Sequence, residues 1–325
     1  MRSLNTKVLV VLWMISLLSL TLFIGAGVAA GYPEKPITYM IAFSPGGESD
    51  VTARMQQKYL EDDLKTKILI TYKTGGGGSV AWAELVRANP DGYTIAGVNE
   101  PHTILQPMQR ADTGYKTEDL TRIAGFQYTP TCLIVRKESS FKTAKDLVEY
   151  AKKNPGVVTI GGTGTWASTH FTYLLFEKGS GIKLTYVPYK GSGATKPAVL
   201  GGHVSAIVGH PTHAVALGDK VRVLAMASLE RSKALPDVPT FKELGYGDIV
   251  EGSFRGVAAP PGTPKEIVER LASAFKKINL NPEFRKKMIS LGFDLLWWGP
   301  EEYEAKIKQK QEFYKKLLAD FGYKK

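Results

Sequence analysis

Three glycine-rich loops carry the residues whose types and spacing could bind a ligand, and each follows a predicted strand. The loop at residues 44–50 has two adjacent glycines directly before a predicted helix that starts at about Glu48. Bare backbone N–H groups at a helix start can bind an oxyanion, and the positive end of the helix dipole favours it. The loop at 161–170 has the same design with added hydroxyl groups, and 189–193 offers a phenol and an ammonium group. The three loops predict a carboxylate-binding site, although glycines at such junctions can also serve only a tight turn.

The candidate ligand-binding residues come from these loops and from the ends of two further strands. They are Ser44, Pro45, Gly46, Gly47, Glu48, Asp50, Asn99, Thr163, Gly164, Thr165, Ser168, Thr169, Tyr189, Lys190 and His210. His210 could donate a hydrogen bond to a ligand or be a simple loop residue. His210 and His213 lie three residues apart, but a structural or catalytic metal site needs at least three converging ligands. We therefore predict no metal and no other cofactor.

The sequence lacks the motifs of the common nucleotide and hydrolase sites. The glycine run at 75–79 does not end in the Gly-Lys-Ser/Thr of a P-loop, no G-x-G-x-x-G follows the first strand, and no G-x-S-x-G elbow is present around Gly164. A secreted hydrolase or transferase with His170 or His210 as base would need a nucleophile, for which Ser168 or Thr169 is the nearby candidate. No acidic third member follows at a recognisable spacing. We therefore predict a protein that is not an enzyme, with a hydrolase as the less favoured alternative.

Short apolar or β-branched runs alternate with helical patterns from residue 36 onward, which is typical of βαβ units. Thr143 is placed to cap a helix over 144–153, and another helix starts near Ser168. Beyond residue 250 the pattern is mostly helical, with a predicted capping box at 263–266. Further helix starts are predicted at 281–282 and 299–300. The predicted strands span 37–43, 67–72, 93–98, 132–136, 157–161, 184–187, 204–208 and 221–227.

The strand and helix pattern restarts after residue 130, which predicts two α/β lobes. We place lobe 1 at 31–130, lobe 2 at 131–249, and a return to lobe 1 with the C-terminal helices at 250–325. The chain would cross between the lobes near 125–131 and 249–255. These crossings would act as the hinge of lobe closure.

The N-terminus is typical of a secretory signal peptide. Arg2 and Lys7 precede an apolar run from Val8 to Ile24, and small residues follow up to Ala30. We predict cleavage after Ala30, and a retained membrane anchor is the alternative. Removal of residues 1–30 leaves 40 basic and 31 acidic residues, since the full chain has 42 and 31 and loses two basic ones. An exported chain whose lysines alternate with acidic residues, as in the predicted last helix, is not expected to bind nucleic acid. Cys132 is the single cysteine, so no intrachain disulfide forms, and we expect a buried structural thiol.

An ordered series of motifs resembles the solute receptors of tripartite tricarboxylate transporters, also called the Bug family. The series spans 32–37, 43–54, 76–79, 89–94, 162–165, 187–191, 201–204, 235–240 and 259–264. The resemblance implies a two-lobe periplasmic-binding-protein fold of type II, the Venus flytrap, with mixed sheets flanked by helices. It implies a non-enzymatic, monomeric periplasmic receptor that holds a small organic carboxylate between its lobes, through loops 44–50 and 163–170. The receptor would deliver the ligand to the membrane permease subunits. A sensory module for a membrane signalling protein uses the same cleft, and the sequence leaves this alternative open.

The candidate pocket departs from the family pattern at several positions. Glu48 stands where a small or neutral residue is common, Trp166 lies inside the second loop, and 209–211 reads Gly-His-Pro. Glu100 follows the third strand. Two carboxylates near the mouth would repel a second anionic group on the ligand. We therefore expect a ligand with a single carboxylate, or one with an aromatic or amine portion that Trp166, Glu48 or Glu100 would favour.

Overall fold

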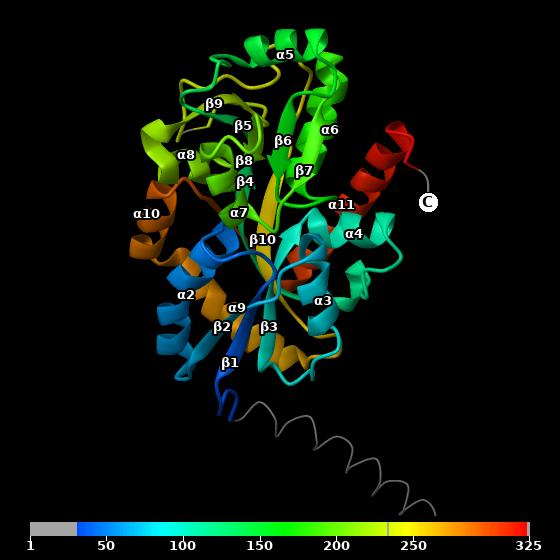
Figure 1. The fold of residues 1–325 in the computed structure, drawn as a ribbon. Helices are drawn as coiled ribbons and strands as arrows, with labels where there is room; N and C mark the ends of the chain where they lie inside the picture. The colour runs from blue at the N-terminus through cyan, green and yellow to red at the C-terminus, as the bar shows by residue number, and fades with distance from the viewer. Residues whose placement is uncertain (1–30, 233, 324–325) are drawn as a thin grey trace, which may run out of the picture.

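The computed structural model describes residues 31–232 and 234–323, so the predicted signal peptide lies outside the described residues. Two mixed β-sheets, each flanked by helices, lie one above the other in Figure 1. This arrangement confirms the predicted α/β fold of two lobes with mixed sheets flanked by helices.

The larger sheet has six strands in the order β11-β4-β10-β3-β1-β2. β1 pairs in parallel with β2 and β3, whereas β10 pairs antiparallel with β3 and β4. Helices α2, α9 and α10 cover one face, and α3, α4 and α11 cover the other. The strands are β1 (Ile37–Ile41), β2 (Ile68–Tyr72), β3 (Thr94–Glu100), β4 (Thr121–Pro130), β10 (Gly252–Ala259) and β11 (Asp294–Trp298). The helices are α2 (Glu48–Leu64), α3 (Ser79–Leu85), α4 (His102–Gln109), α9 (Lys265–Leu280), α10 (Pro282–Ser290) and α11 (Pro300–Asp320), with short 3-10 turns η1 (Gly76–Gly78) and η2 (Thr117–Asp119).

The smaller sheet has five strands in the order β7-β6-β8-β5-β9. β6 pairs in parallel with β7 and β8, and β5 pairs antiparallel with β8 and β9. The strands are β5 (Cys132–Arg136), β6 (Thr159–Gly162), β7 (Thr185–Pro188), β8 (Ala206–Gly209) and β9 (Val221–Met226). The helices are α5 (Ala144–Lys153), α6 (Ser168–Ser180), α7 (Ser192–Leu200) and α8 (Pro211–Leu217), with the 3-10 turn η3 (Gly218–Lys220).

Two chain segments connect the sheets side by side. β4 ends at Pro130 in the larger sheet, and β5 begins at Cys132 in the smaller one. Between them Thr131 donates its backbone N–H to the Glu251 carbonyl at 2.9 Å, just before β10 begins. This contact between the two crossings supports the predicted lobe boundaries at 130/131 and 249/250. The boundaries, and a hinge at the crossings, stay predictions.

Each predicted strand up to residue 227 overlaps an observed one, and the Thr143 cap is confirmed by a 3.2 Å bond from the Asp146 N–H. Cys132 is confirmed as a buried thiol. The capping box at 263–266 is wrong, because the Thr263 hydroxyl donates to the Pro260 carbonyl at 2.8 Å and α9 begins only at Lys265. The mostly helical reading of the C-terminal part missed β10 and β11, whose pairing partner β4 lies far away in the sequence.

Candidate functional site

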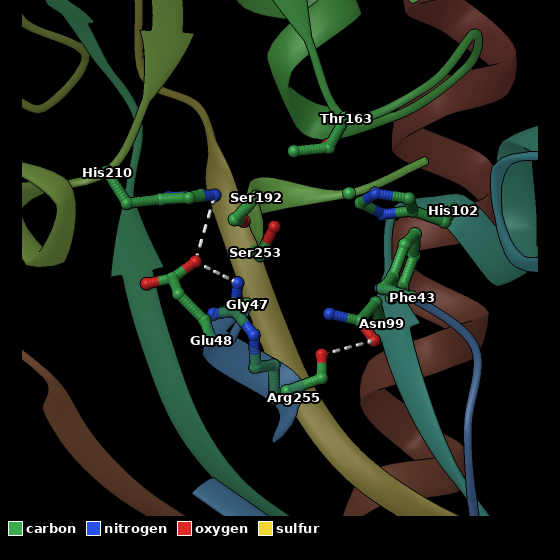
Figure 2. Close-up of a pocket in the computed structure, with 12 residues that line it drawn as sticks. Phe43, Gly47, Glu48, Asn99, His102, Thr163, Ser192, His210, Ser253 and Arg255 are labelled. Atoms are coloured by element: carbon green, nitrogen blue, oxygen red, sulfur yellow. Dashed lines mark hydrogen bonds and ion pairs between the residues drawn. The ribbon is translucent and has the colours of Figure 1, made fainter. Parts of the chain in front are cut away.

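A small pocket lies between the two sheets, at the carboxyl ends of strands from both of them (Figure 2). Ligands of open α/β proteins bind at such ends. The volume of the pocket is about 10 Å³, which is close to the room that one water molecule needs. The lining residues are Phe43, Gly47, Glu48, Ser49, Asn99, His102, Thr163, Gly191, Ser192, His210, Ser253 and Arg255.

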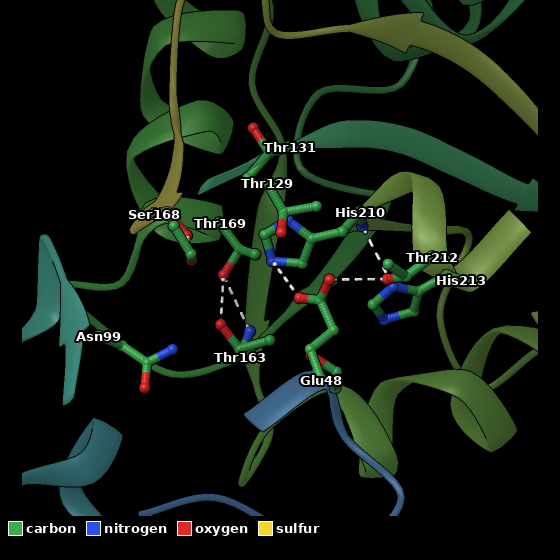
Figure 3. A network of polar contacts seen from close by, with 12 residues as sticks. Glu48, Asn99, Thr129, Thr131, Thr163, Ser168, Thr169, His210, Thr212 and His213 are labelled. Carbon is green, nitrogen blue, oxygen red and sulfur yellow. Dashed lines mark hydrogen bonds and ion pairs between the residues drawn. The ribbon is translucent and has the colours of Figure 1, made fainter. Parts of the chain in front are cut away.

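A buried cluster of charged and polar side chains surrounds Glu48 (Figure 3). The Arg255 guanidinium from β10 pairs with the Glu48 carboxylate. His210 Nε2 lies 3.2 Å from the same carboxylate oxygen, and the Thr212 hydroxyl donates to the other oxygen at 2.7 Å. Glu48 is the first residue of α2, which packs on the larger sheet, whereas His210 and Thr212 follow β8 of the smaller sheet. The Glu48 carboxylate therefore joins the two halves of the protein.

The protonation of this cluster follows from its burial and its partners. Burial raises the pKa of Glu48. The opposing effects of Arg255, the two neighbouring histidines and the Thr212 hydroxyl are together larger, so the pKa of Glu48 falls below the usual value. Burial, with help from Arg255 and His210, lowers the pKa of His102 to about 3, so His102 is neutral at pH 7. Burial also lowers the pKa of His210, although the Glu48 carboxylate opposes the shift. Glu48 is thus ionised beside an ionised Arg255.

The first predicted loop, 44–50, meets the other half of the protein directly. Ser44 donates its N–H to the Lys190 carbonyl at 3.0 Å, and Lys196 Nζ donates to the Gly46 carbonyl at 2.8 Å. A Cβ on Gly193 would lie 2.3 Å from the Pro45 carbonyl oxygen, so only glycine permits this approach. The loops at 44–47 and 190–193 therefore pack against each other.

Asp50 holds the shape of this loop from within. Its carboxylate accepts the Gly46 N–H at 2.7 Å and also bonds Tyr72 and Arg54. Among the described residues no side chain caps α2, and Gly47 at the N-cap lines the pocket. Asp50 thus supports the helix start and stays out of the pocket lining.

The second predicted loop contributes one side chain to the pocket lining, Thr163. The Thr169 hydroxyl accepts the Thr163 N–H at 2.9 Å and lies 3.0 Å from the Thr163 hydroxyl, so Thr169 positions Thr163. Ser168 bonds Ser253 on β10 at 2.8 Å, and Thr165 is exposed. The loop therefore presents Thr163 to the pocket, whereas Thr169 supports Thr163 and Ser168 contacts the larger sheet.

Five of the predicted residues line the pocket, namely Gly47, Glu48, Asn99, Thr163 and His210. Gly47 and Thr163, from the two opposed glycine loops, share this one hollow. The other predicted residues lie around it without lining it: Ser44, Pro45, Gly46, Asp50, Gly164, Thr165, Ser168, Thr169, Tyr189 and Lys190. Ligand contact by any residue of the set stays a prediction.

Sequence reasoning missed several lining residues, and Arg255 is the most important. Arg255 fell in a segment interpreted as a crossing, yet it lies on β10 and is 5% exposed. Its Nε and the Nδ1 of His102 are buried without a hydrogen-bond partner among the described residues. A ligand in the pocket could satisfy both atoms. The signal in the sequence was a lone arginine within an apolar run at 252–259.

Two residues that were expected near the pocket lie elsewhere. Trp166 packs edge-on against Tyr323, with ring centroids 5.1 Å apart, and does not line the pocket. Glu100 is fully buried and accepts hydrogen bonds from Thr103 and Tyr303 on the opposite side of the sheet. The reason is the two-residue period of a strand, which turns Asn99 to the pocket and Glu100 away from it.

No three histidine, cysteine, aspartate or glutamate side chains within residues 31–232 and 234–323 gather closely enough to hold a metal ion. None of the helices formed by these residues combines the length and the apolar character needed to cross a membrane.

Comparison with known proteins points to one family. BugD, a periplasmic binding protein of known structure, superposes with a TM-score of 0.84 at 29% identity, over 90% of this chain and 99% of BugD. MatC from Rhodopseudomonas palustris with bound malate shares the fold, with a TM-score of 0.82 at 23% identity, over 88% of this chain and all of MatC.

Two curated relatives match over most of their length. A UPF0065 protein from the gbd 5' region of Cupriavidus necator is 30% identical over 292 residues, which are 90% of this chain and 89% of that protein. Protein BugT of Bordetella pertussis is 29% identical over 252 residues, which are 75% and 77% of the two chains. The family model described as tripartite tricarboxylate transporter family receptor matches residues 52–322. The chain therefore belongs to the tripartite tricarboxylate transporter receptor family, the Bug-type solute-binding proteins.

Proposed function

We propose that this receptor captures a small carboxylate-bearing solute between its two lobes outside the cytoplasm and delivers it to the permease subunits of a tripartite tricarboxylate-type transporter. The observation that carries the proposal is the shared pocket of two opposed glycine loops. Gly47 comes from the larger sheet and Thr163 from the smaller one. A carboxylate is bound by groups such as backbone amides at a helix start, a hydroxyl, and the Arg255 Nε, which has no partner within 31–232 and 234–323.

Entry of such a ligand requires the lobes to move apart. A pocket of about 10 Å³ holds roughly one water molecule, and any organic acid is larger. The contacts that close it come from both halves, including the bond from Thr212 to Glu48 and the bond from Ser44 to Lys190. Opening would break these contacts and leave the hydrogen-bonded crossing at Thr131 and Glu251 as the hinge. A bound ligand would then favour the closed form.

The family of the chain supports the proposed delivery step and the proposed location. The family description names a receptor of a tripartite tricarboxylate transporter. Such a receptor would act as a monomer in the periplasm, after cleavage near Ala30. It would perform no chemistry on its ligand.

A thermal-shift screen of the purified protein with monocarboxylates, dicarboxylates, aromatic acids and amino acids tests the binding proposal. A true ligand at a hundredfold excess over its Kd adds about 2.7 kcal/mol of stability. Thr163→Val should reduce this gain, because it removes a lining hydroxyl without changing the size of the side chain. Thr185→Val on exposed β7 is the matched control and should retain the gain.

Two results would overturn the proposal. One is that no carboxylate stabilises the protein at millimolar concentration, and the other is conversion of a bound carboxylate into product. Uptake of the identified ligand into vesicles that contain the permease, dependent on added receptor, would establish delivery. Binding without uptake, together with activation of a membrane signalling protein, would establish a sensory role instead.

A further inference from the structure

We propose that Glu48 is a built-in counter-ion of Arg255 that restricts the pocket to ligands with a single carboxylate. The inference deepens the proposed carboxylate-receptor function and rests on it. It makes Glu48 a specificity-determining residue whose removal should convert the pocket to dicarboxylates.

The charges of the pocket lining carry the argument. Four of the lining residues can be charged, namely Glu48, Arg255, His102 and His210. Glu48 and Arg255 form an ion pair and cancel each other. His102 is neutral because its pKa is about 3. The lining therefore has no net charge, or one positive charge when His210 holds a proton.

His210 sets the upper limit of this charge. Its Nδ1 lies 3.0 Å from the Pro130 carbonyl, and its Nε2 lies 3.2 Å from Glu48, so both ring nitrogens face acceptors. A protonated ring would satisfy both contacts. Even then, one ligand carboxylate neutralises the pocket, and a second carboxylate stays uncompensated.

The positive charge of Arg255 is already paired with Glu48 before a ligand binds. One terminal nitrogen serves Glu48 and the other donates to the Thr129 hydroxyl at 3.1 Å. Nε has no partner among the described residues, and each terminal nitrogen has one further N–H, so a ligand would find donors on Arg255 but no unpaired charge. The Glu48 side chain is held on its other side by Thr212, so it cannot leave Arg255 without losing that bond as well.

Nearby lysines do not supply the missing positive charge. Lys196 donates to the Gly46 carbonyl at 2.8 Å and lines a separate cavity on the other side of Glu48. Lys190 is exposed, and neither lysine lines the pocket. A second carboxylate would be desolvated without a cation and would be repelled by Glu48.

Calorimetric titration with matched acids tests the inference. Butanoate and succinate have the same number of carbons, as do hexanoate and adipate, and each pair differs by one carboxylate. In the wild-type protein the monocarboxylate should bind at least tenfold more tightly than its dicarboxylate. In Glu48→Gln the freed Arg255 should raise the dicarboxylate-to-monocarboxylate affinity ratio at least tenfold.

Two further variants separate the local charge from other effects. Glu302→Gln makes the same change in net charge on exposed α11, and its affinity ratio should equal that of the wild type. Glu48→Gln combined with Arg255→Met removes both charges and should return the ratio to the wild-type value. The double variant leaves no unpaired buried cation, so it can be measured even if Glu48→Gln unfolds.

The outcomes distinguish this inference from the proposed function. Equal binding of succinate and butanoate by the wild-type protein would overturn the role of Glu48 and leave a carboxylate receptor in place. A Glu48→Gln ratio equal to that of Glu302→Gln would do the same. Failure of all four acids and of the wider screen to bind would overturn both proposals together.

Discussion

Two buried glutamate–arginine pairs lie on opposite faces of the same sheet and have different roles. Glu48 and Arg255 line the pocket, whereas Glu100 and Arg122 are enclosed under α11, with no exposure of either side chain. The pairs are neighbours, because Arg255 is opposite Asn99 in the register of β10 and β3, one residue from Glu100. A single step along a strand therefore separates the candidate site from the core.

The environment of each glutamate decides its ionisation. Burial raises the pKa of Glu100, and Arg122, 3.4 Å away, together with the Tyr303 hydroxyl offsets this only in part. Burial also raises the pKa of Glu48, but the closer pairing with Arg255 and the bonds from the other lobe outweigh it, so the net shift is downward. The pair of Glu48 and Arg255 is therefore an ion pair that lines the pocket, and the pair of Glu100 and Arg122 is a structural contact in the core.

The largest expected effect is a loss of unfolding free energy when the buried pair of Glu100 and Arg122 is broken. Glu100→Gln should lower the free energy of unfolding by about 3–5 kcal/mol, since it leaves the buried Arg122 charge without its anionic partner. Arg122→Met should cost less, because Glu100 can take up a proton whereas a guanidinium cannot lose one. Glu48→Gln should also cost less than Glu100→Gln, because Arg255 borders the pocket. Urea unfolding of the three variants checks this order, and equal costs would remove the distinction.

Acid should destabilise the protein through its buried histidines. Burial lowers the pKa of His102 and of His213 to about 3 and that of His170 to about 4. The unfolded chain takes up these protons near pH 6.5 and the folded chain does not, so stability falls as the pH drops below 6.5. At pH 5 the loss is on the order of 2 kcal/mol per histidine.

Glu48 and Glu100 shift the same pH profile in opposite directions. Stability from Glu48, whose pKa is lowered, is present above the ordinary glutamate pKa and is lost as the pH falls through its folded value. The contribution of Glu100, whose pKa is raised, is present at low pH and is lost as the pH rises.

Melting temperatures from pH 8 to 4 for the wild type and for His102→Asn check the histidine prediction. The fall in melting temperature with decreasing pH should be shallower in the variant. An unchanged slope in His102→Asn would contradict the assigned protonation.

The smallest effects come from one hydrogen bond in each pair. Tyr303→Phe removes a 3.2 Å bond to Glu100, and Thr212→Val removes the 2.7 Å bond to Glu48. Each should cost about 1–3 kcal/mol of unfolding free energy, because the acceptor is charged or partly so. Only Thr212→Val should also raise the radius of gyration in small-angle scattering, since Thr212 and Glu48 belong to different halves. An equal change in both variants would show that Glu48 does not hold the lobes together.

Local sequence patterns were enough to predict the α/β class, every strand up to residue 227 except β4, and the loops that face the pocket. Glycines before helix starts at Gly46–Gly47 and around Gly164 have a local physical cause, so they could be recognised without a structure. The Thr143 cap was predictable for the same reason, whereas the Thr263 box was wrong, because α9 begins one residue later than expected, with Pro264 at the N-cap. β10 was missed because its ladder partners in β3 and β4 are more than a hundred residues away.

By itself, the sequence determined the fold class, the family and the presence of Gly47, Glu48, Asn99, Thr163 and His210 at the ends of strands. Only the tertiary structure decided that Glu48 meets Arg255, 207 residues later in the chain, and that Glu100 does not share its pocket. The physical reason is that an ion pair depends on the distance between two side chains, and this distance is set by sheet register and strand pleat. Neither the register nor the pleat can be predicted from the spacing of residues along the chain.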